Sequence, residues 1–234
     1  MIKTILLNEL RFLTFRRVSP EVQANRRAFL AFGLFVTWLA GIGRYWDNPR
    51  AERWQALGLG SLAYVFLLAL FLWGLLAPLR PRSWSYLNVL LFLTLTAPPA
   101  LLYAIPVEKF LAPEAARDAN VWLLAIVSMW RVALLVVFLS RTGGLSAGQV
   151  IVATLLPLSL IIITLSILNL EHVVFNIMGG IRPGDRSPHD KAYQVVFFLS
   201  LISFFLAPIL GIAYVIMAML AKFRIRRAQK DPTS

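Results

Sequence analysis

Residues 57–79 read LGLGSLAYVFLLALFLWGLLAPL and contain no charged side chain. An α-helix needs about 20 consecutive, predominantly apolar residues to cross the hydrocarbon core of a bilayer, so this stretch is long enough to span one. Five further apolar stretches reach a comparable length, at 28–45, 86–105, 121–140, 150–170 and 192–221. The sequence therefore predicts an all-α integral membrane protein with six transmembrane helices.

The composition of the whole chain supports this prediction. Of the 234 residues, 59% are hydrophobic and 15% are charged, whereas a soluble domain is about 45–50% apolar and about 25% charged. The surface of a soluble domain must face water, so its core cannot hide an excess of this size. Cysteine is absent, which excludes disulfides, thiolate metal sites and cysteine nucleophiles. Soluble enzymes, disordered regulators and disulfide scaffolds are therefore excluded.

The distribution of Lys and Arg indicates how the chain is threaded. With six spans, fourteen of the 23 basic residues lie on the side of the two termini, eight lie on the other side, and Arg131 lies within a span. Because cytoplasmic loops are enriched in Lys and Arg, we expect both termini in the cytoplasm, at a bacterial inner membrane. The predicted organisation is a basic cytoplasmic or interfacial segment over 1–27, a transmembrane domain over 28–221 and a basic cytoplasmic tail over 222–234.

The basic N-terminal segment has apolar side chains at helical spacing: Ile2, Ile5, Leu6, Leu10 and Leu13. Lys3, Asn8 and Arg11 fall on other faces, whereas Glu9 falls within the apolar stripe. The pattern leaves open an interfacial helix, followed by a break at 19–20. We expect the basic termini to contact membrane lipids with anionic head groups. The formal net charge of +12 does not indicate nucleic-acid binding, since no groove-reading fold or zinc spacing occurs.

Arg131 is the most informative single residue. It lies near the middle of the fourth span, where a charge costs at least about 2.5–3.5 kcal/mol, and such residues face the bundle interior and have a partner. Glu171, at the outer end of the fifth span, would reach it only by snorkelling or a vertical offset of the helices. Asn169, Thr164 and backbone carbonyls freed near Pro157 are alternative partners. Two interpretations stay open: a residue that lines a polar path, and a buried charge that sets the helix register.

Two other groups of residues resemble sites. Residues 144–148 read GLSAG and match G-x-S-x-G, but that motif needs a preceding strand and a nearby histidine. A predicted helix precedes it, and the better interpretation is a turn in which Ser146 and Gln149 form a capping box. Four residues bracket one outer loop, without the spacing of a zinc site: Glu171, His172, His189 and Asp190. We therefore expect no catalytic residue, no metal and no cofactor.

Prolines interrupt three of the predicted spans. They lie at Pro98 and Pro99 in the third span, Pro157 in the fifth and Pro208 in the sixth. Broken spans mark transport sites in some membrane proteins, because freed backbone groups need protein or water around them, while isolated prolines often only kink a helix. We expect a helix break at each of these positions and a bundle that is not straight.

Residues 142–150, TGGLSAGQV, are followed by an apolar helix containing Pro157. They resemble the GG-x-x-S-x-x-Q-V turn and helix of bacterial Yip1-type polytopic inner-membrane proteins, although the turn is one residue shorter here. This resemblance implies a helical, non-enzymatic membrane protein and assigns no functional residue. The six spans, cytoplasmic ends and basic N-terminal segment are also similar in architecture to the permease half of ABC-2-type exporters.

Two functions are compatible with these features. The first is a non-catalytic scaffold or accessory subunit of a larger membrane assembly, whose partners are other membrane protein subunits. The second is a transporter or exporter permease with a polar path near Arg131. The chain contains no G-x-x-x-x-G-K-[ST] motif, so a nucleotide-binding partner of such an exporter would be a separate chain.

Overall fold

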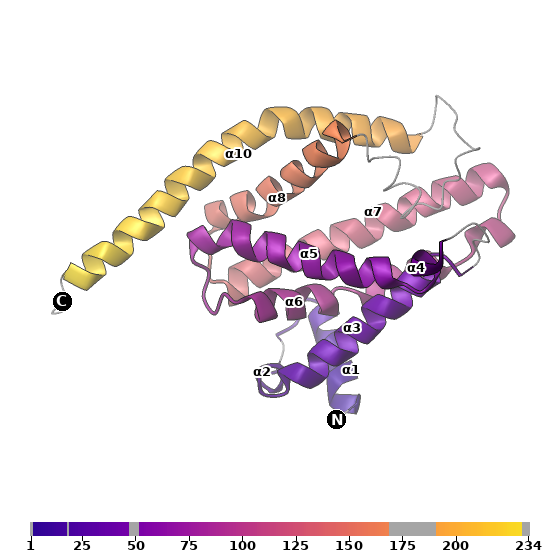
Figure 1. The fold of residues 1–234 in the computed structure, drawn as a ribbon, viewed down its shortest axis with the longest axis horizontal. Helices are drawn as coiled ribbons and strands as arrows, with labels where there is room; N and C mark the ends of the chain where they lie inside the picture. Colours follow the sequence, from indigo (N-terminus) through magenta and orange to yellow (C-terminus); the bar gives the residue numbers. More distant parts are fainter. Residues whose placement is uncertain (1, 18, 47–51, 169–190, 231–234) are drawn as a thin grey trace. The chain divides into compact units, whose positions relative to one another are not determined.

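The computed structural model describes residues 2–17, 19–46, 52–168 and 191–230 (Figure 1). Every regular element in these ranges is helical. In chain order the elements are α1 (Ile2–Leu13), α2 (Glu21–Ala24), α3 (Arg26–Gly43), α4 (Arg53–Ala56), α5 (Leu59–Leu76), η1 (Ala77–Leu79), α6 (Tyr86–Leu95), η2 (Pro98–Ala104), η3 (Val107–Lys109), α7 (Pro113–Val137), the π-helical η4 (Phe138–Thr142), α8 (Ala147–Ile167) and α10 (Lys191–Lys230).

Five helices of the described residues are long and apolar enough to cross a membrane. They cover Arg26–Gly43, Leu59–Leu79, Glu114–Thr142, Ala147–Ile167 and Phe197–Phe223. A sixth crossing requires α6 and η2 together, which bend by 44° at the break between them. The prediction of an all-helical membrane protein is confirmed at this level, with five spans or six. The predicted positions of the two termini relative to the membrane stay predictions.

The expected helix breaks are correct at one place and wrong at two. The third span does break, since α6 ends at Leu95 and η2 begins at Pro98. Pro157 and Pro208 instead lie inside the continuous helices α8 and α10. A single proline removes one backbone donor, and a helix in a bundle accommodates this loss by local adjustment. Two adjacent prolines remove consecutive donors, which explains why only the pair at 98 and 99 ends its helix.

The described chain forms two compact units. The first contains Met1–Leu70 and Tyr86–Leu134, and the second contains Phe71–Ser85 with the described parts of 135–172 and 187–234. The predicted division at residues 27 and 221 is not tested by this arrangement and stays a prediction.

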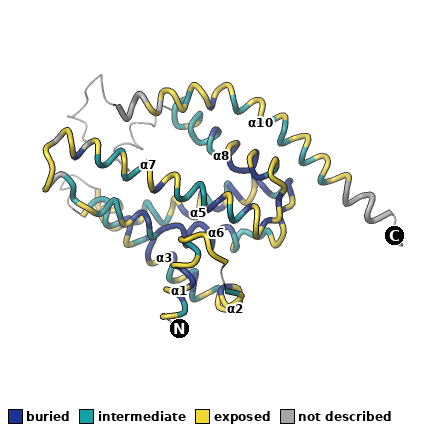
Figure 2. The backbone as a smooth tube through the Cα atoms, turned by 180° about the vertical axis from the view of Figure 1, so that it is seen from behind, coloured by how far each residue is buried: buried dark blue, intermediate teal, exposed yellow. Residues whose placement is uncertain are grey.

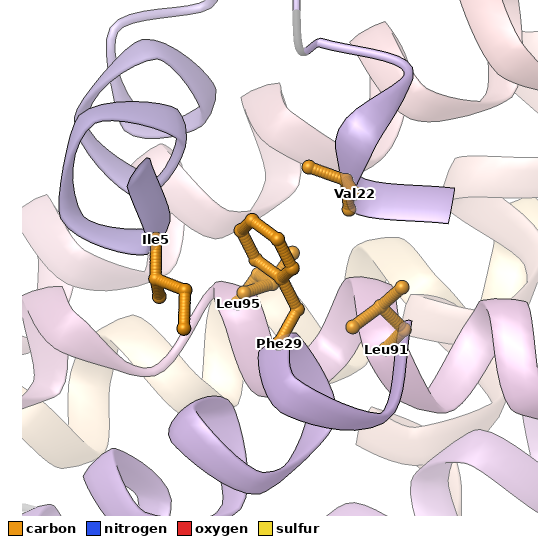
Figure 3. Close-up of a cluster of buried hydrophobic side chains, with 5 residues drawn as sticks. All are labelled: Ile5, Val22, Phe29, Leu91 and Leu95. Carbon is orange, nitrogen blue, oxygen red and sulfur yellow. The ribbon is translucent and has the colours of Figure 1, made fainter. Parts of the chain in front are cut away.

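Close helix packing organises the first unit. Arg26 Nη1 lies 3.5 Å from Asn88 Oδ1 near the start of α3 and α6. At the other end, a Cβ on Gly43 would lie 2.7 Å from the Ala104 Cβ. The α6 and η2 segment therefore runs in the same direction as α3. Between α1, α2, α3 and α6 lies a buried apolar cluster (Figure 3): Ile5, Val22, Phe29, Leu91 and Leu95.

The helix α1 forms where the sequence left a helix open, and its interfacial position stays a prediction. The buried residues are Ile5, Asn8 and Glu9, which are spaced to share one face. Ile2 and Leu10, which belong to the apolar stripe of the sequence, are exposed. The polar pair thus faces the protein, and an apolar surface faces outward. Phe12 continues the inner face and contacts the Phe92 ring edge-on, with centroids 6.0 Å apart.

The second unit is organised by α8 and α10. These helices are antiparallel, since the Ser166 and Ser200 hydroxyl oxygens are 2.6 Å apart at one end. At the other end, a Cβ on Gly148 would lie 3.5 Å from the Met217 Cε. Val152, Leu156 and Leu210 form the buried cluster between them. Much of the rest of α10 is exposed (Figure 2), and between residues 195 and 220 its exposed large side chains are apolar, as lipid contact requires.

Candidate functional site

The break in the third span supplies the partner of Arg131. Pro98 and Pro99 carry no backbone N–H, so the chain tightens there, and the Ala100 amide donates to the Ala97 carbonyl at 2.8 Å. The carbonyl four residues before Ala100 belongs to Thr96 and is thereby left without its helical donor. The Arg131 Nε donates to this oxygen at 2.9 Å. Arg131 is therefore a half-buried charge held by a freed backbone carbonyl.

This partner differs from the expected ones. Glu171 and Asn169 lie outside the described residues, as does the polar candidate His172, so pairing of Arg131 with Glu171 or Asn169 stays untested. Thr164 and a carbonyl freed near Pro157 were two of the alternative partners. The observed acceptor comes instead from the break at Pro98, because α8 does not break at its proline. The type of acceptor was predicted, but the helix that supplies it was not.

A second arginine, not singled out in the sequence, lies near Arg131. Arg44 directly follows the last residue of α3, and its guanidinium carbon lies 5.0 Å from the centre of the Tyr103 ring. The buried Nε of Arg44 has no hydrogen-bond partner among the described residues, and neither has the buried hydroxyl of Tyr103. Arg44, Tyr64 and Tyr103 all interact electrostatically with Arg131. We call Arg44, Tyr64, Tyr103 and Arg131 the arginine cluster.

The close approach of α3 and η2 explains how the cluster forms. A side chain at Gly43 would collide with Ala104, so glycine at 43 lets the two backbones come together. Arg44 directly follows Gly43, and Tyr103 directly precedes Ala104. The close approach therefore brings the Arg44 guanidinium over the Tyr103 ring. In the sequence, Arg44 was only one of the eight basic residues counted on the side opposite the termini. Its only signal was its place at the end of the predicted span 28–45.

The arginine cluster carries two positive charges and no compensating carboxylate among the described residues. A guanidinium withdrawn from water is costly unless its charge and its donors are satisfied. The cation–π contact with Tyr103 and the Thr96 carbonyl satisfy part of this requirement, since both present negative potential. They do not neutralise the charges. The arrangement can therefore hold an anion.

The glycine-serine turn is a helix cap. Ser146 directly precedes α8, and its backbone N–H donates to Gln149 Oε1 at 3.1 Å, in a capping box. Gly144 has a φ of +62°, which favours glycine, and the Gly143 carbonyl accepts from the Arg82 amide at 2.8 Å. The element before this turn is helical rather than a strand. The prediction of a turn with a capping box is confirmed. The serine lacks the setting of a nucleophile elbow.

The four residues weighed for a metal site are Glu171, His172, His189 and Asp190. All of them lie in 169–190, outside the described residues. Within the described ranges, no three His, Asp or Glu side chains are grouped so that they could hold a metal ion.

A buried acid lies on the inner face of α1. Glu9 is 5% exposed, and neither of its carboxylate oxygens has a hydrogen-bond partner in the described part of the chain. Burial raises the pKa of this carboxyl from 4.5 to about 8. Its neighbour Asn8 is satisfied, because its amide donates to the Thr4 carbonyl at 3.0 Å and its oxygen accepts from the Ser19 amide at 3.1 Å. The sequence showed a polar residue in an apolar stripe, but not that it would be buried.

Comparisons of the chain with models of known protein families, with curated proteins and with solved structures found no match. The resemblance of residues 142–150 to Yip1-type proteins accordingly stays a prediction. The function has to be inferred from the chemistry of the chain itself.

Proposed function

We propose that the protein is a non-catalytic, multi-pass protein of a bacterial inner membrane that serves as a scaffold or accessory subunit of a larger membrane assembly. The observation that carries this proposal is a small-residue face on α10 that packs against no described part of the chain at Gly211. A Cβ built on Gly211 would have no atom within 4 Å. Ala207 lies four residues earlier, on the same face of the helix. Small residues at this spacing let two membrane helices approach closely.

The surroundings of this face agree with a helix partner in the bilayer. Large apolar side chains lie exposed on the same side of α10, among them Phe204 and Val215. The side of α10 that faces α8 is already occupied, through Leu206, Leu210 and Met217. An additional helix would therefore add a second contact to α10 rather than replace the first.

The test is replacement of Gly211 by leucine, which would fill the space beside Ala207. The protein is extracted from its own membrane in a mild detergent after chemical cross-linking, and its partners are identified by mass spectrometry. We expect the wild-type chain in a complex and the Gly211→Leu chain depleted of its partner. Gly74→Leu is the matched control, since Gly74 on α5 also has no atom within 4 Å of a Cβ. Recovery of the wild-type chain as a monomer would refute the subunit role.

One observation favours the second candidate, a transporter. Arg131 of α7 donates a hydrogen bond to the Thr96 carbonyl, which lies at the break between α6 and η2. Discontinuous spans and intramembrane charges recur at substrate sites of transporters. Charge reversal in Arg131→Glu is expected to abolish the flux of a carried solute in proteoliposomes, while the exposed Arg53→Glu is not. If Arg131 is structural, the same change lowers the amount of protein in the membrane and leaves the flux per molecule unchanged.

A further inference from the structure

We propose that the arginine cluster binds a phosphate group of net negative charge, through Arg44, Arg131 and Tyr103. The proposal does not depend on the scaffold role, because the cluster lies within the first unit and does not involve Gly211 of α10.

The hydrogen-bond donors of the cluster are incompletely used. A guanidinium carries five N–H donors. Arg131 gives its Nε to the Thr96 carbonyl, while Arg44 leaves a buried Nε without an acceptor. The buried hydroxyl of Tyr103, whose ring lies against Arg44, also lacks a partner in the described residues. Buried polar groups are rarely left unpaired, and those that lack a protein partner often face an ion or a ligand.

The charges of the cluster point to the sign of the ligand. Arg44 and Arg131 carry like charges, which repel each other when both are buried in one cluster. The tyrosine hydroxyls donate and accept hydrogen bonds but carry no negative charge to cancel two guanidiniums. A single anion placed against both guanidiniums would remove this repulsion and satisfy their free donors.

The chemistry of the donors favours phosphate. The planar fork of a guanidinium matches two oxygens of a phosphate or carboxylate, and a phosphate offers further oxygens to a second guanidinium and a hydroxyl. Two arginines and one tyrosine hydroxyl thus suit a phosphate better than a carboxylate, which has only two oxygens.

The end of the span near Arg44 carries features of a membrane interface. The Trp46 indole donates to the Ala104 carbonyl at 3.1 Å, next to Tyr103 in the chain. The Lys109 ammonium lies 4.5 Å from the centre of the Trp46 ring, which adds a third positive charge at this end. Tryptophan and lysine are typical of the head-group region. The phosphate can therefore come from an anionic phospholipid head group or from a free phosphate in solution.

The experiment measures the melting temperature of the purified full-length protein in nanodiscs with two probes. One probe is inorganic phosphate, compared with chloride at equal ionic strength in nanodiscs of phosphatidylcholine. The other is phosphatidylglycerol, mixed in equal parts with phosphatidylcholine. Stabilisation by inorganic phosphate supports the proposal and identifies a soluble ligand. Stabilisation by phosphatidylglycerol alone supports it and identifies a lipid head group. No stabilisation by either probe overturns it.

Variants then locate the binding. We expect Arg44→Gln and Arg131→Gln each to weaken the binding of the active probe by at least about tenfold, as loss of a charged hydrogen-bond donor does. Tyr103→Phe keeps the ring and removes only the hydroxyl, so it tests the cluster even if an arginine variant fails to fold. Arg53→Gln is the control, since Arg53 is exposed on α4. Binding that is unchanged in Tyr103→Phe and in the foldable arginine variants, or weakened equally in Arg53→Gln, overturns the proposal.

Discussion

The buried Glu9 predicts that the docking of α1 weakens as the pH rises. Burial raises the pKa of this carboxyl from 4.5 to about 8, so the docked helix retains a proton that the undocked helix releases. The docked state therefore has its full stability below about pH 4.5 and loses it progressively until the pH passes 8. A difference of one pKa unit between the docked and undocked helix corresponds to about 1.4 kcal/mol of docking free energy. Between pH 5.5 and 8 the expected loss is about 3 kcal/mol, or on the order of 100-fold in the docking equilibrium.

The absence of cysteine allows this loss to be measured with a single introduced thiol. Ile5→Cys places the thiol on the buried face of α1, where Ile5 is 6% exposed. A membrane-permeant maleimide can label it only when α1 leaves the apolar cluster. Labelling is measured from pH 5.5 to 8 with Glu9 and, in parallel, with Glu9→Gln. The pH also changes the ionisation of the thiol, but it does so equally in both chains. The ratio of the labelling rate with Glu9 to that with Glu9→Gln is therefore free of this effect.

We expect the chain with Glu9 to be labelled progressively faster than the Glu9→Gln chain, by on the order of 100-fold in their ratio across this range. The amide of glutamine has nearly the same shape as the acid and does not ionise. Glu21→Gln is the control, because Glu21 is exposed on α2, and it should leave the pH dependence unchanged. A ratio that stays constant with pH would show that Glu9 is not buried as an acid, and would refute the reasoning.

Two further predictions concern packing and capping. Gly33→Ala would place a Cβ 2.6 Å from Thr94 Oγ1 and should destabilise the protein by about 1–3 kcal/mol in a denaturant titration, whereas Gly74→Ala should not, because nothing lies within 4 Å of its Cβ. Equal effects of the two changes would contradict close packing of α3 on α6. Ser146→Ala removes the side chain of the capping box at the start of α8 and should cost about 1 kcal/mol in the same titration. No change in stability would show that this cap is unimportant.

The apolar stretches were predictable because their signal is local and long. The spans that contain α3, α5, α7 and α8 lie close to their predicted ranges, and the capping box of Ser146 depends on residues three positions apart. The break at Pro98 was predictable because two adjacent prolines remove two donors. Continuity at Pro157 and Pro208 was not, since the effect of one proline depends on what packs around it.

The candidate site was predictable only in part, because most of it depends on tertiary contacts. Arg131 was recognisable as a charge within a span, but its acceptor at Thr96 arises from the bend of another helix. Arg44 was missed because its contact with Tyr103 follows from the close approach of Gly43 and Ala104. The spacing on α1 placed Glu9 in one apolar stripe with Ile2 and Leu10, but it could not show which side of the helix packs against the protein: Glu9 is buried, and Ile2 and Leu10 are exposed.

The number of crossings follows most directly from the sides on which the two termini lie. The described residues give five crossings if the bent α6 and η2 pair re-enters on its own side, or six if the pair spans the membrane. Single cysteines placed before α1 and after Lys230 can be labelled with a membrane-impermeant maleimide in inverted and in right-side-out vesicles. We predict that both thiols react only in inverted vesicles, as six crossings with cytoplasmic ends require. Labelling of the two thiols from opposite sides would contradict the threading.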